Sequence, residues 1–481
     1  MSNWQWHWPR PDVLWTDVVI YLLLLAAGLG ARHAWRRPHL HATWRRMLAD
    51  PAAACSAIVL AFFLLLTVAD SIHFRRALPA PDGHGVVYDA RTTSVLDVLL
   101  ERLIESRESS YSAPLAWHSF GKESQVIDGQ AVREVARLQH GGAHLADPAR
   151  DWSGDVLRSV LAGAAGGLLL AALLWMAARK WQRRQAEQGR APWLPVGPML
   201  CTVAIIFVLM GITIALMPAY HVLGTDRTGN DVLYQALKSV RTAFVIGSLS
   251  SIATLPLAVG LGIVAGYARG WADDAIQYGY TLLSSVPNVL LIAACVLIMQ
   301  GVFDQHPDWF DTGAQRSDVR LFVLCVILGL TGWAGLCRLV RAEAIKLREL
   351  DYVLAAQAFG VGAGRIMARH IFPNVLHLVL ITTVLDFSAL ILYEAVLSYV
   401  GVGVDPSMNS FGGMINLART EMSRDPLVWW PFATAFVVMV VLVLAANLFA
   451  DGVREAFDPR GRLFRPAWRK RAKAGAKAEV A

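Results

Sequence analysis

The chain has 481 residues, of which 55% are hydrophobic and 17% are charged, and its mean hydropathy is +0.44. Soluble domains carry about 25% charged residues, so this composition excludes an ordinary soluble protein and indicates a membrane protein. The net charge of +7 is better explained by basic residues that flank membrane segments than by nucleic-acid binding, so no nucleic-acid partner is expected.

Apolar runs long enough to cross a hydrocarbon layer about 30 Å thick occur along the whole chain. Lipid cannot satisfy open backbone groups, and the runs do not alternate as barrel strands do. We therefore expect helices and an all-α integral membrane fold. Nine spans are predicted, at 13–31, 52–71, 157–178, 194–217, 243–267, 279–301, 320–340, 374–398 and 429–450.

The first span begins the chain and contains Asp17. A cleaved signal sequence is one reading. An uncleaved anchor is favoured, because only Arg10 precedes the apolar run while Arg36 and Arg37 follow it.

Basic residues gather in loops 32–47, 179–190 and 338–373 and in the tail 460–477. Nine spans put these segments on one side of the membrane, and the positive-inside rule makes that side the cytoplasm. The segment 72–156 is then external, and we expect an amphipathic helix near residues 95–108 that uses Val95, Leu96, Val98, Leu99 and Leu103.

Two pairs of glycines with GxxxG spacing are expected to allow close helix packing: Gly163 with Gly167, and Gly262 with Gly266. Pro256 and Pro287 are expected to kink their spans.

The long cytoplasmic loop contains a helical stripe made by Tyr352, Ala355, Ala356 and Phe359, at i, i+3, i+4 and i+7. Gly360 follows where a helix stop with positive φ is expected. Small residues between aromatic anchors suit docking in a groove of a partner protein. The alternative is an amphipathic helix that lies on the lipid surface.

This loop resembles the cytoplasmic "EAA" loop of ABC importer permeases, in which a coupling helix docks on the ATPase subunit. Ala355, Ala356, Gly360 and Pro373 match that motif, and Leu354 stands where many members have Glu. The loop is also similar to the dipeptide/oligopeptide branch, through Arg365–Ile366, Arg369–His370 and Asn374.

Further stretches resemble the same branch. HVLGTDRTGNDVL at 221–233 is similar to its external motif, although Asn230 replaces the usual Arg. ILYEAVLSYVGVG at 391–403 and SFGGMINLAR at 410–419 are similar to later motifs, with Phe411 in place of Trp. The matching residues of the external motif are His221, Gly224, Thr225, Asp226, Gly229 and Asp231.

Acidic residues inside spans are functional candidates by default. Asp386 and Glu394 fall eight residues apart in the eighth predicted span. Both are candidates for the pathway, but Glu394 matches a family position, so a structural role near the external end is favoured over substrate contact for it. Asp386 is a candidate for the pathway, where it would meet a peptide N-terminus.

The resemblance implies a six-helix type I importer core. Five of its helices are the predicted spans within the core region 218–450, which carries the coupling loop 341–373, and the span 194–217 would be the first helix. Outside the core region lie the N-terminal spans 1–71, the external segment 72–156, two further spans within 157–217 and a basic tail 451–481. Residues 45–71 also look like the entry to the family's first span, in which case 72–217 is an insertion.

The resemblance implies a non-enzymatic transport subunit for peptides or peptide-like solutes in the bacterial inner membrane. No GxxxxGK[ST] loop occurs, so ATP hydrolysis is expected on partner chains. The implied partners are two ABC ATPase subunits, a second homologous permease, an external solute-binding protein and the lipid bilayer. No catalytic residue, cofactor or metal is expected. The alternatives are an ion-coupled secondary transporter and a membrane-anchored envelope factor.

Overall fold

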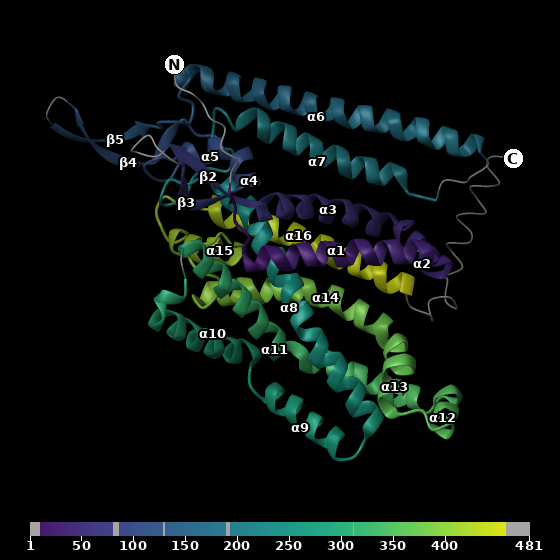
Figure 1. Ribbon diagram of the computed structural model, residues 1–481. Helices are drawn as coiled ribbons and strands as arrows, with labels where there is room; N and C mark the ends of the chain where they lie inside the picture. The colour runs from purple at the N-terminus through teal and green to yellow at the C-terminus, as the bar shows by residue number, and fades with distance from the viewer. Residues whose placement is uncertain (1–9, 80–85, 128–129, 189–192, 311, 458–481) are drawn as a thin grey trace.

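A computed structural model describes residues 10–79, 86–127, 130–188, 193–310 and 312–457 (Figure 1). In that part of the chain, nine helices are long and apolar enough to span a membrane, and each overlaps one predicted span. They are α1 (Trp15–Arg36), α3 (Pro51–Ser71), α6 (Pro148–Glu187), α7 (Val196–Leu216), α8 (Val232–Ala268), α10 (Asn288–Gln305), α11 (Gly313–Arg348), α14 (Phe372–Val400) and α16 (Trp430–Phe457). The all-α membrane fold is confirmed.

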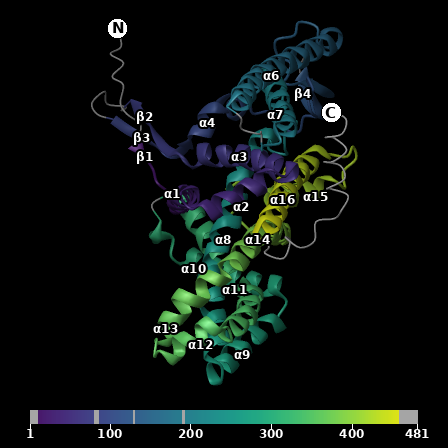
Figure 2. The same cartoon turned by 90° about the vertical axis from the view of Figure 1, so that its right-hand side faces the viewer.

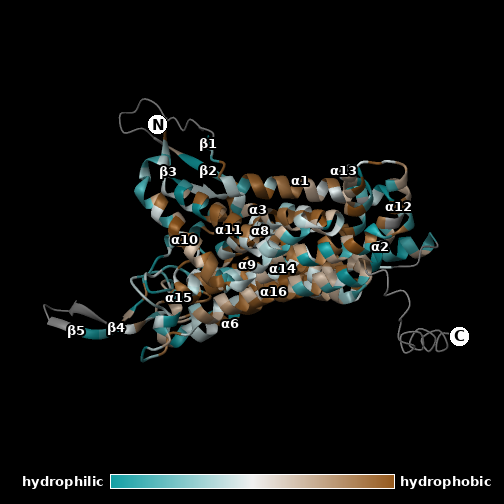
Figure 3. Ribbon diagram, turned by 90° about the horizontal axis from the view of Figure 1, so that it is seen from below, coloured by the Kyte–Doolittle hydropathy of each residue, from teal (hydrophilic) through white to brown (hydrophobic). Residues whose placement is uncertain are grey.

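The two ends of this helical body differ in structure and polarity. The β-strands and α15 (Phe411–Glu421) lie at one end, and the short helices α2 (Pro38–Leu48), α12 (Asp351–Ala358) and α13 (Ala363–Ile366) lie at the other (Figure 1). Figure 3 shows hydrophilic residues at both ends and hydrophobic residues along the helices between them. The described basic loops share the end of α2 and α12, as the predicted orientation requires. The tail 460–477 lies outside the described residues.

Helices α8 and α11 form the centre of the body. A Cβ on Gly262 would lie 2.8 Å from Val340 Cβ, and one on Gly266 would lie 2.6 Å from Ala344 Cβ. The predicted close packing through this glycine pair is therefore confirmed. Pro256 lies inside α8, which remains one continuous helix.

Helix α3 is packed into this body, whereas α6 and α7 lie outside it (Figure 2). Phe63 of α3 belongs to the same buried cluster as Val232 of α8 and Trp430 of α16. Helices α6 and α7 pack mainly on each other, and a Cβ on Gly163 would lie 2.5 Å from the backbone oxygen of Gly211.

The predicted span 279–301 is interrupted in the structure, so its bounds are corrected. Helix α9 (Trp271–Ser285) ends at Ser285, Val286 is extended, and α10 starts at Asn288. A residue before proline is pushed out of the helical region, so Pro287 separates the two helices instead of kinking one. The membrane-spanning helix is therefore α10.

The predicted helix near residues 95–108 is two short helices, α4 (Val95–Leu99) and α5 (Glu101–Glu105). Leu96 and Leu103 are buried as expected. Val98 and Leu99 are exposed, because the helix is interrupted at Leu100 and one continuous apolar stripe does not form.

Strands also form at the external end, four from the segment 72–156 and β1 from the residues before α1, and the hydropathy pattern did not predict them. A three-stranded antiparallel sheet has the order β1-β2-β3, and β4 and β5 form a separate antiparallel pair. The strands are β1 (Arg10–Pro11), β2 (His73–Pro79), β3 (Val86–Ser94), β4 (His118–Ile127) and β5 (Gln130–Arg137).

Candidate functional site

The predicted stripe on the cytoplasmic loop faces solvent. Tyr352 is 43% exposed, Phe359 is 87% exposed and Ala355 is exposed, whereas Ala356 is only partly exposed. These large aromatic side chains are exposed on a short helix at the hydrophilic end of the molecule, where they are available for contact with a partner. Gly360 ends the helix with φ +74°, which confirms the predicted stop.

Helix α12 is fixed to the body from its opposite side. Val353 is fully buried in a cluster with Ile366 and Ile371. Gln357 Nε2 donates to the hydroxyl of Tyr267 at 3.3 Å, and Arg348 donates to the Tyr267 backbone oxygen at 2.8 Å. Tyr267 is at the end of α8, so α12 contacts the last turn of α8 directly.

The second half of the loop leads into the next span. A π-helical turn (Met367–Ile371) follows α13, and Pro373 lies in the first turn of α14, where its missing N–H is not needed. Arg365 is exposed. The ring of His370 lies 6.1 Å from the ring of Tyr352, which links the two ends of the loop.

The external motif forms the start of α8. The carboxylate of Asp231 accepts hydrogen bonds from the N–H groups of Leu233 and Tyr234, at 2.8 and 3.2 Å. It also accepts one from Nδ1 of His221, at 2.8 Å. A carboxylate at this position satisfies free N–H groups and favours the helix dipole.

Glu108 lies on the other side of the His221 ring. Its carboxylate oxygen is 3.5 Å from Nε2, a distance of an ion pair and not of a short hydrogen bond. The N–H groups of Gln139, His140 and Gly141 donate to the same carboxylate at 2.9, 2.8 and 3.0 Å. The residue therefore joins the base of the β4–β5 pair to the external motif.

Both charges in this contact are stabilised by their partners. Burial alone would raise the pKa of Glu108, but the nearby imidazole of His221 and hydrogen bonds from the three N–H groups outweigh it and lower the pKa to about 2. Burial alone would lower the pKa of His221, but Asp231 and Glu108 outweigh it and raise the pKa to about 9. At neutral pH the imidazole is therefore charged.

Two glycines let the motif pass close to the external segment. Gly224 and Gly229 have φ of +74° and +77°. A Cβ would lie 2.5 Å from Ser112 O at Gly224, and 2.6 Å from the carbonyl carbon of Glu108 at Gly229. A larger residue fits at neither position.

Thr225 and Asp226 complete the turn. The N–H of Ser112 donates to Thr225 Oγ1 at 2.6 Å, and the indole N–H of Trp430 donates to Thr225 O at 2.9 Å. Asp226 accepts from the N–H of Asn230 at 2.9 Å and from the side chain of Gln235 at 2.6 Å. The six motif residues thus lie in one turn that connects α8, α16 and the external segment.

The two acids of α14 have different surroundings. Glu394 is 1% exposed and accepts from Ser398 Oγ at 2.7 Å, and a Cβ on Gly412 would lie 2.9 Å from its Oε1. It therefore lies at the contact of α14 with α15. Asp386 is half-buried, and among the described residues it has no hydrogen bond or ion pair.

The sequence did not identify a polar network at the external end of α8. Arg241 and Lys238 pair there with Asp17, Asp70 and Asp97. The available signals were Asp17 and Asp70, each an acidic residue in a predicted apolar span, because a buried charge requires a partner. A cavity of about 520 Å³ opens beside the network.

These features define a helical, multi-pass membrane protein with an exposed helix at its basic end. Residues 258–463 match the family described as "Binding-protein-dependent transport system inner membrane component". An oligopeptide transport system permease protein, OppC, of Mycobacterium tuberculosis is 31% identical over 245 residues, which are 51% of this chain and 78% of that protein.

Two further relatives have similar names. OppC of Haemophilus influenzae is 29% identical over 246 residues, which are 51% of this chain and 72% of that protein. The dipeptide transport system permease protein DppC of Lactococcus lactis is 29% identical over 243 residues, which are 50% of this chain and 64% of that protein. The chain therefore belongs to the family of inner membrane components of binding-protein-dependent transport systems, and the predicted inner-membrane location is confirmed.

The His221 contact predicts a pH dependence of stability. Its pKa rises from 6.5 to about 9 on folding, so its contribution is complete below about 6.5 and is lost as pH rises through 9. The loss amounts to about 3 kcal/mol or less. Glu108, whose pKa falls on folding, contributes fully above about 4.5. We expect thermal unfolding in detergent to occur at lower temperature at pH 9 than at pH 6.5.

His221→Gln removes the titrating group and should flatten this dependence. The control is His144→Gln, since His144 is a half-exposed histidine that pairs with Asp155 at 2.9 Å. The control should keep the wild-type dependence. An unchanged pH dependence in His221→Gln would show that another group is responsible.

Proposed function

We propose that this chain is the permease subunit of an ATP-driven importer of peptides or peptide-like solutes, and that α12 couples it to separate ATPase subunits. The observation that carries the proposal is the exposed face of α12 in a chain of this family. An interfacial helix would turn Tyr352 and Phe359 toward lipid, but α12 projects from the end of the molecule beyond α14 and α16 (Figure 1).

The contacts of α12 support a path for the movement that ATP drives. A displacement of α12 acts on Tyr267 directly through Gln357, and Arg348, the last residue of α11 before α12, donates to the backbone oxygen of the same tyrosine. Tyr267 belongs to α8, and α8 packs on α11 through Gly262 and Gly266. Helices in such close contact move together or slide as units. The chain then needs no ATP-binding loop of its own.

We assign the six-helix core to α3, α8, α10, α11, α14 and α16. The two candidates for the first core helix are α3 and α7. Helix α3 shares a buried cluster with α8 and α16, whereas α7 packs on α6 and α3 at the edge of the helical body. This assignment supports the reading in which residues 72–217 are an insertion. Two ATPase subunits, a second permease and an external binding protein complete the proposed importer.

The peptide class of solute is supported by the names of the relatives, which are oligopeptide and dipeptide permeases. Within the membrane, Asp386 is the candidate for contact with the ammonium group of such a solute, because it is half-buried and lacks a partner among the described residues.

The coupling role predicts that Ala355→Arg and Phe359→Ala release the ATPase subunits. Both residues are exposed, so the fold should persist while the docking surface is blocked by the introduced arginine or loses the Phe359 anchor. Loss of such an anchor typically costs about 2 kcal/mol or more of binding free energy, which lowers the affinity about 30-fold. The measurement is co-purification of the ATPase with the tagged permease, together with ATP-driven uptake.

The matched control is Ala42→Arg, which makes the same change at an exposed alanine of α2 at the same end of the molecule. It should retain the ATPase. If Ala355→Arg retains both the ATPase and uptake, the coupling role is wrong. Uptake by wild type without any ATPase would instead favour the ion-coupled transporter.

Asp386→Asn is expected to lower peptide uptake about tenfold, since an ion pair with the solute in a low-dielectric pathway is worth more than 1.4 kcal/mol. Asp386→Glu, which keeps the charge, should retain more of the activity. Equal uptake by wild type and Asp386→Asn would remove this residue from the pathway.

A further inference from the structure

The external half of α8 carries two cations, Lys238 and Arg241, three residues apart and thus on one side of the helix. The helix has 37 residues, which at 1.5 Å each is about 55 Å and exceeds the roughly 30 Å of hydrocarbon. Lys238 and Arg241 lie in its first three turns, at the external end.

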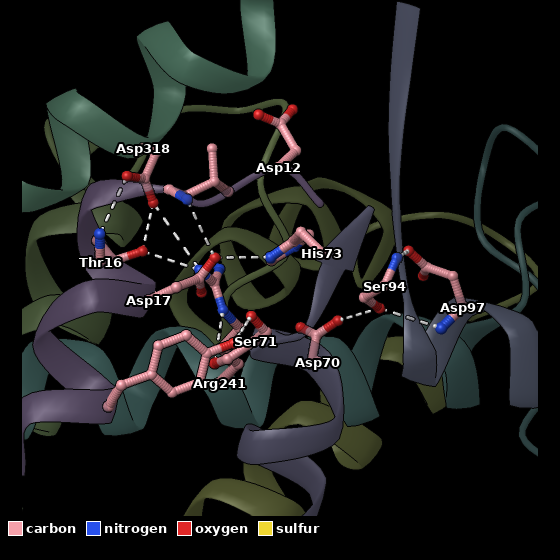
Figure 4. Close-up of polar contacts among 12 residues, drawn as sticks. Asp12, Thr16, Asp17, Asp70, Ser71, His73, Ser94, Asp97, Arg241 and Asp318 are labelled. Carbon is pink, nitrogen blue, oxygen red and sulfur yellow. Dashed lines mark hydrogen bonds and ion pairs between the residues drawn. The ribbon is translucent and has the colours of Figure 1, made fainter. Parts of the chain in front are cut away.

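Arg241 is held mainly by the start of α1. Its guanidinium lies 2.7 Å from Asp17 Oδ1 and donates to Thr16 Oγ1 at 2.8 Å (Figure 4). Asp318 of α11 lies 3.8 Å away and accepts from the backbone N–H and hydroxyl of Thr16. The side chains of Arg241 and Asp17 are 5% and 1% exposed, so water does not replace these partners.

Lys238 is held by carboxylates from α3 and α4. Its Nζ lies 2.6 Å from Asp70 Oδ1 of α3 and 2.9 Å from Asp97 Oδ1 of α4. Ser94 joins the two carboxylates: its hydroxyl donates to Asp70 at 2.7 Å and its N–H donates to Asp97 at 2.9 Å. The ammonium group, the two carboxylates and Ser94 therefore form one connected set of contacts.

Each cation has one carboxylate from the proposed core and one from outside it. Asp318 and Asp70 belong to the core helices α11 and α3. Asp17 and Asp97 come from α1 and α4, and we call these two residues the external clamp. Without the clamp, Lys238 would keep Asp70 and Arg241 would keep Asp318 at 3.8 Å, so both cations would be tied to the core alone and α8 would lose its ion pairs to α1 and α4.

The other end of the same helix contacts the coupling loop through Tyr267. The helix is thus fixed by charge at its external end and touched by α12 at its cytoplasmic end, with Pro256 between them. The family match begins at residue 258, so Lys238, Arg241 and the clamp all precede the matched segment.

We propose that the N-terminal region is a working part of the importer and that Asp17 and Asp97 are positioning residues of its transport cycle. By holding Arg241 and Lys238, they anchor the external end of α8, so that a displacement received from α12 opens or closes the external side of the pathway. Without the anchor, α8 moves as a whole and ATP is hydrolysed without transport. This proposal rests on the proposed function.

The test compares two double variants in proteoliposomes that contain the complete importer with its binding protein. Asp17→Asn with Asp97→Asn removes the clamp charges. The matched control is Asp12→Asn with Glu101→Gln, since these acids pair with Arg75 and Arg76 of β2 at 2.8 and 2.6 Å. The readout is uptake of radiolabelled trialanine per ATP hydrolysed, which a loss of folded protein alone does not change.

The clamp variant should keep its ATPase subunits and hydrolyse ATP, but its uptake per ATP should fall at least about fivefold, the lower range of allosteric coupling. The control should match wild type. Asp17→Glu with Asp97→Glu, which restores the charges, should recover part of the ratio. If the asparagine double variant does not fold, the single change Asp97→Asn, at the rim of the cavity, tests the same ratio.

An unchanged ratio in a folded clamp variant would overturn the positioning role and leave the proposed function intact. Absence of ATP-driven uptake in the wild-type importer would instead overturn the proposed function, and the clamp with it. Failure of the positioning role is therefore measured in the clamp variant, and failure of the proposed function is measured in the wild-type importer.

Discussion

The hydrogen bonds that Asp231 makes at the first turn of α8 fix the position from which the rest of the structure follows. The carboxylate satisfies the N–H groups of Leu233 and Tyr234 and holds the charged ring of His221. Once the helix starts at this residue, its register places Lys238 and Arg241 at the external end and Tyr267 at the cytoplasmic end. One cap thus orients both functional ends of the helix.

The glycines of α8 restrict the register of this helix against α11. Gly262 and Gly266 allow α11 to approach so closely that a Cβ at either position would overlap Val340 or Ala344. A shift of the helix by one residue would move both glycines out of the contact. Capping at one end and close packing near the other therefore define a single arrangement of α8 and α11.

Much of the membrane fold was predictable because hydropathy over about 20 residues is a local signal. The Gly360 helix stop and the exposure of Tyr352 and Phe359 were also predictable, since they depend on helical periodicity and glycine. The interruption at Val286–Pro287 was visible as a proline but was assigned as a kink. Hydropathy does not report where the backbone leaves the helix.

The ion pairs of Arg241 and Lys238 were not predictable. Their partners lie 224 and 168 residues away for Asp17 and Asp70, and no local pattern joins such positions. The strands of the external segment were missed because sequences such as HFRRALP in β2 and VVYDARTTS in β3 are too polar to stand out in a hydropathy profile. Glu108 is another example, because its role depends on three N–H groups near residue 140.

The most direct test of the central claim is cross-linking between Phe359→Cys and the ATPase subunit of the assembled importer. Phe359 is 87% exposed, about twice as exposed as Tyr352 in the same stripe, so a thiol cross-linker should join the two chains there. Ala42→Cys in α2 should give little or no product. A cross-link at residue 359 that changes in yield when ATP is added would support coupling through α12. Absence of any cross-link in an importer that transports would contradict it.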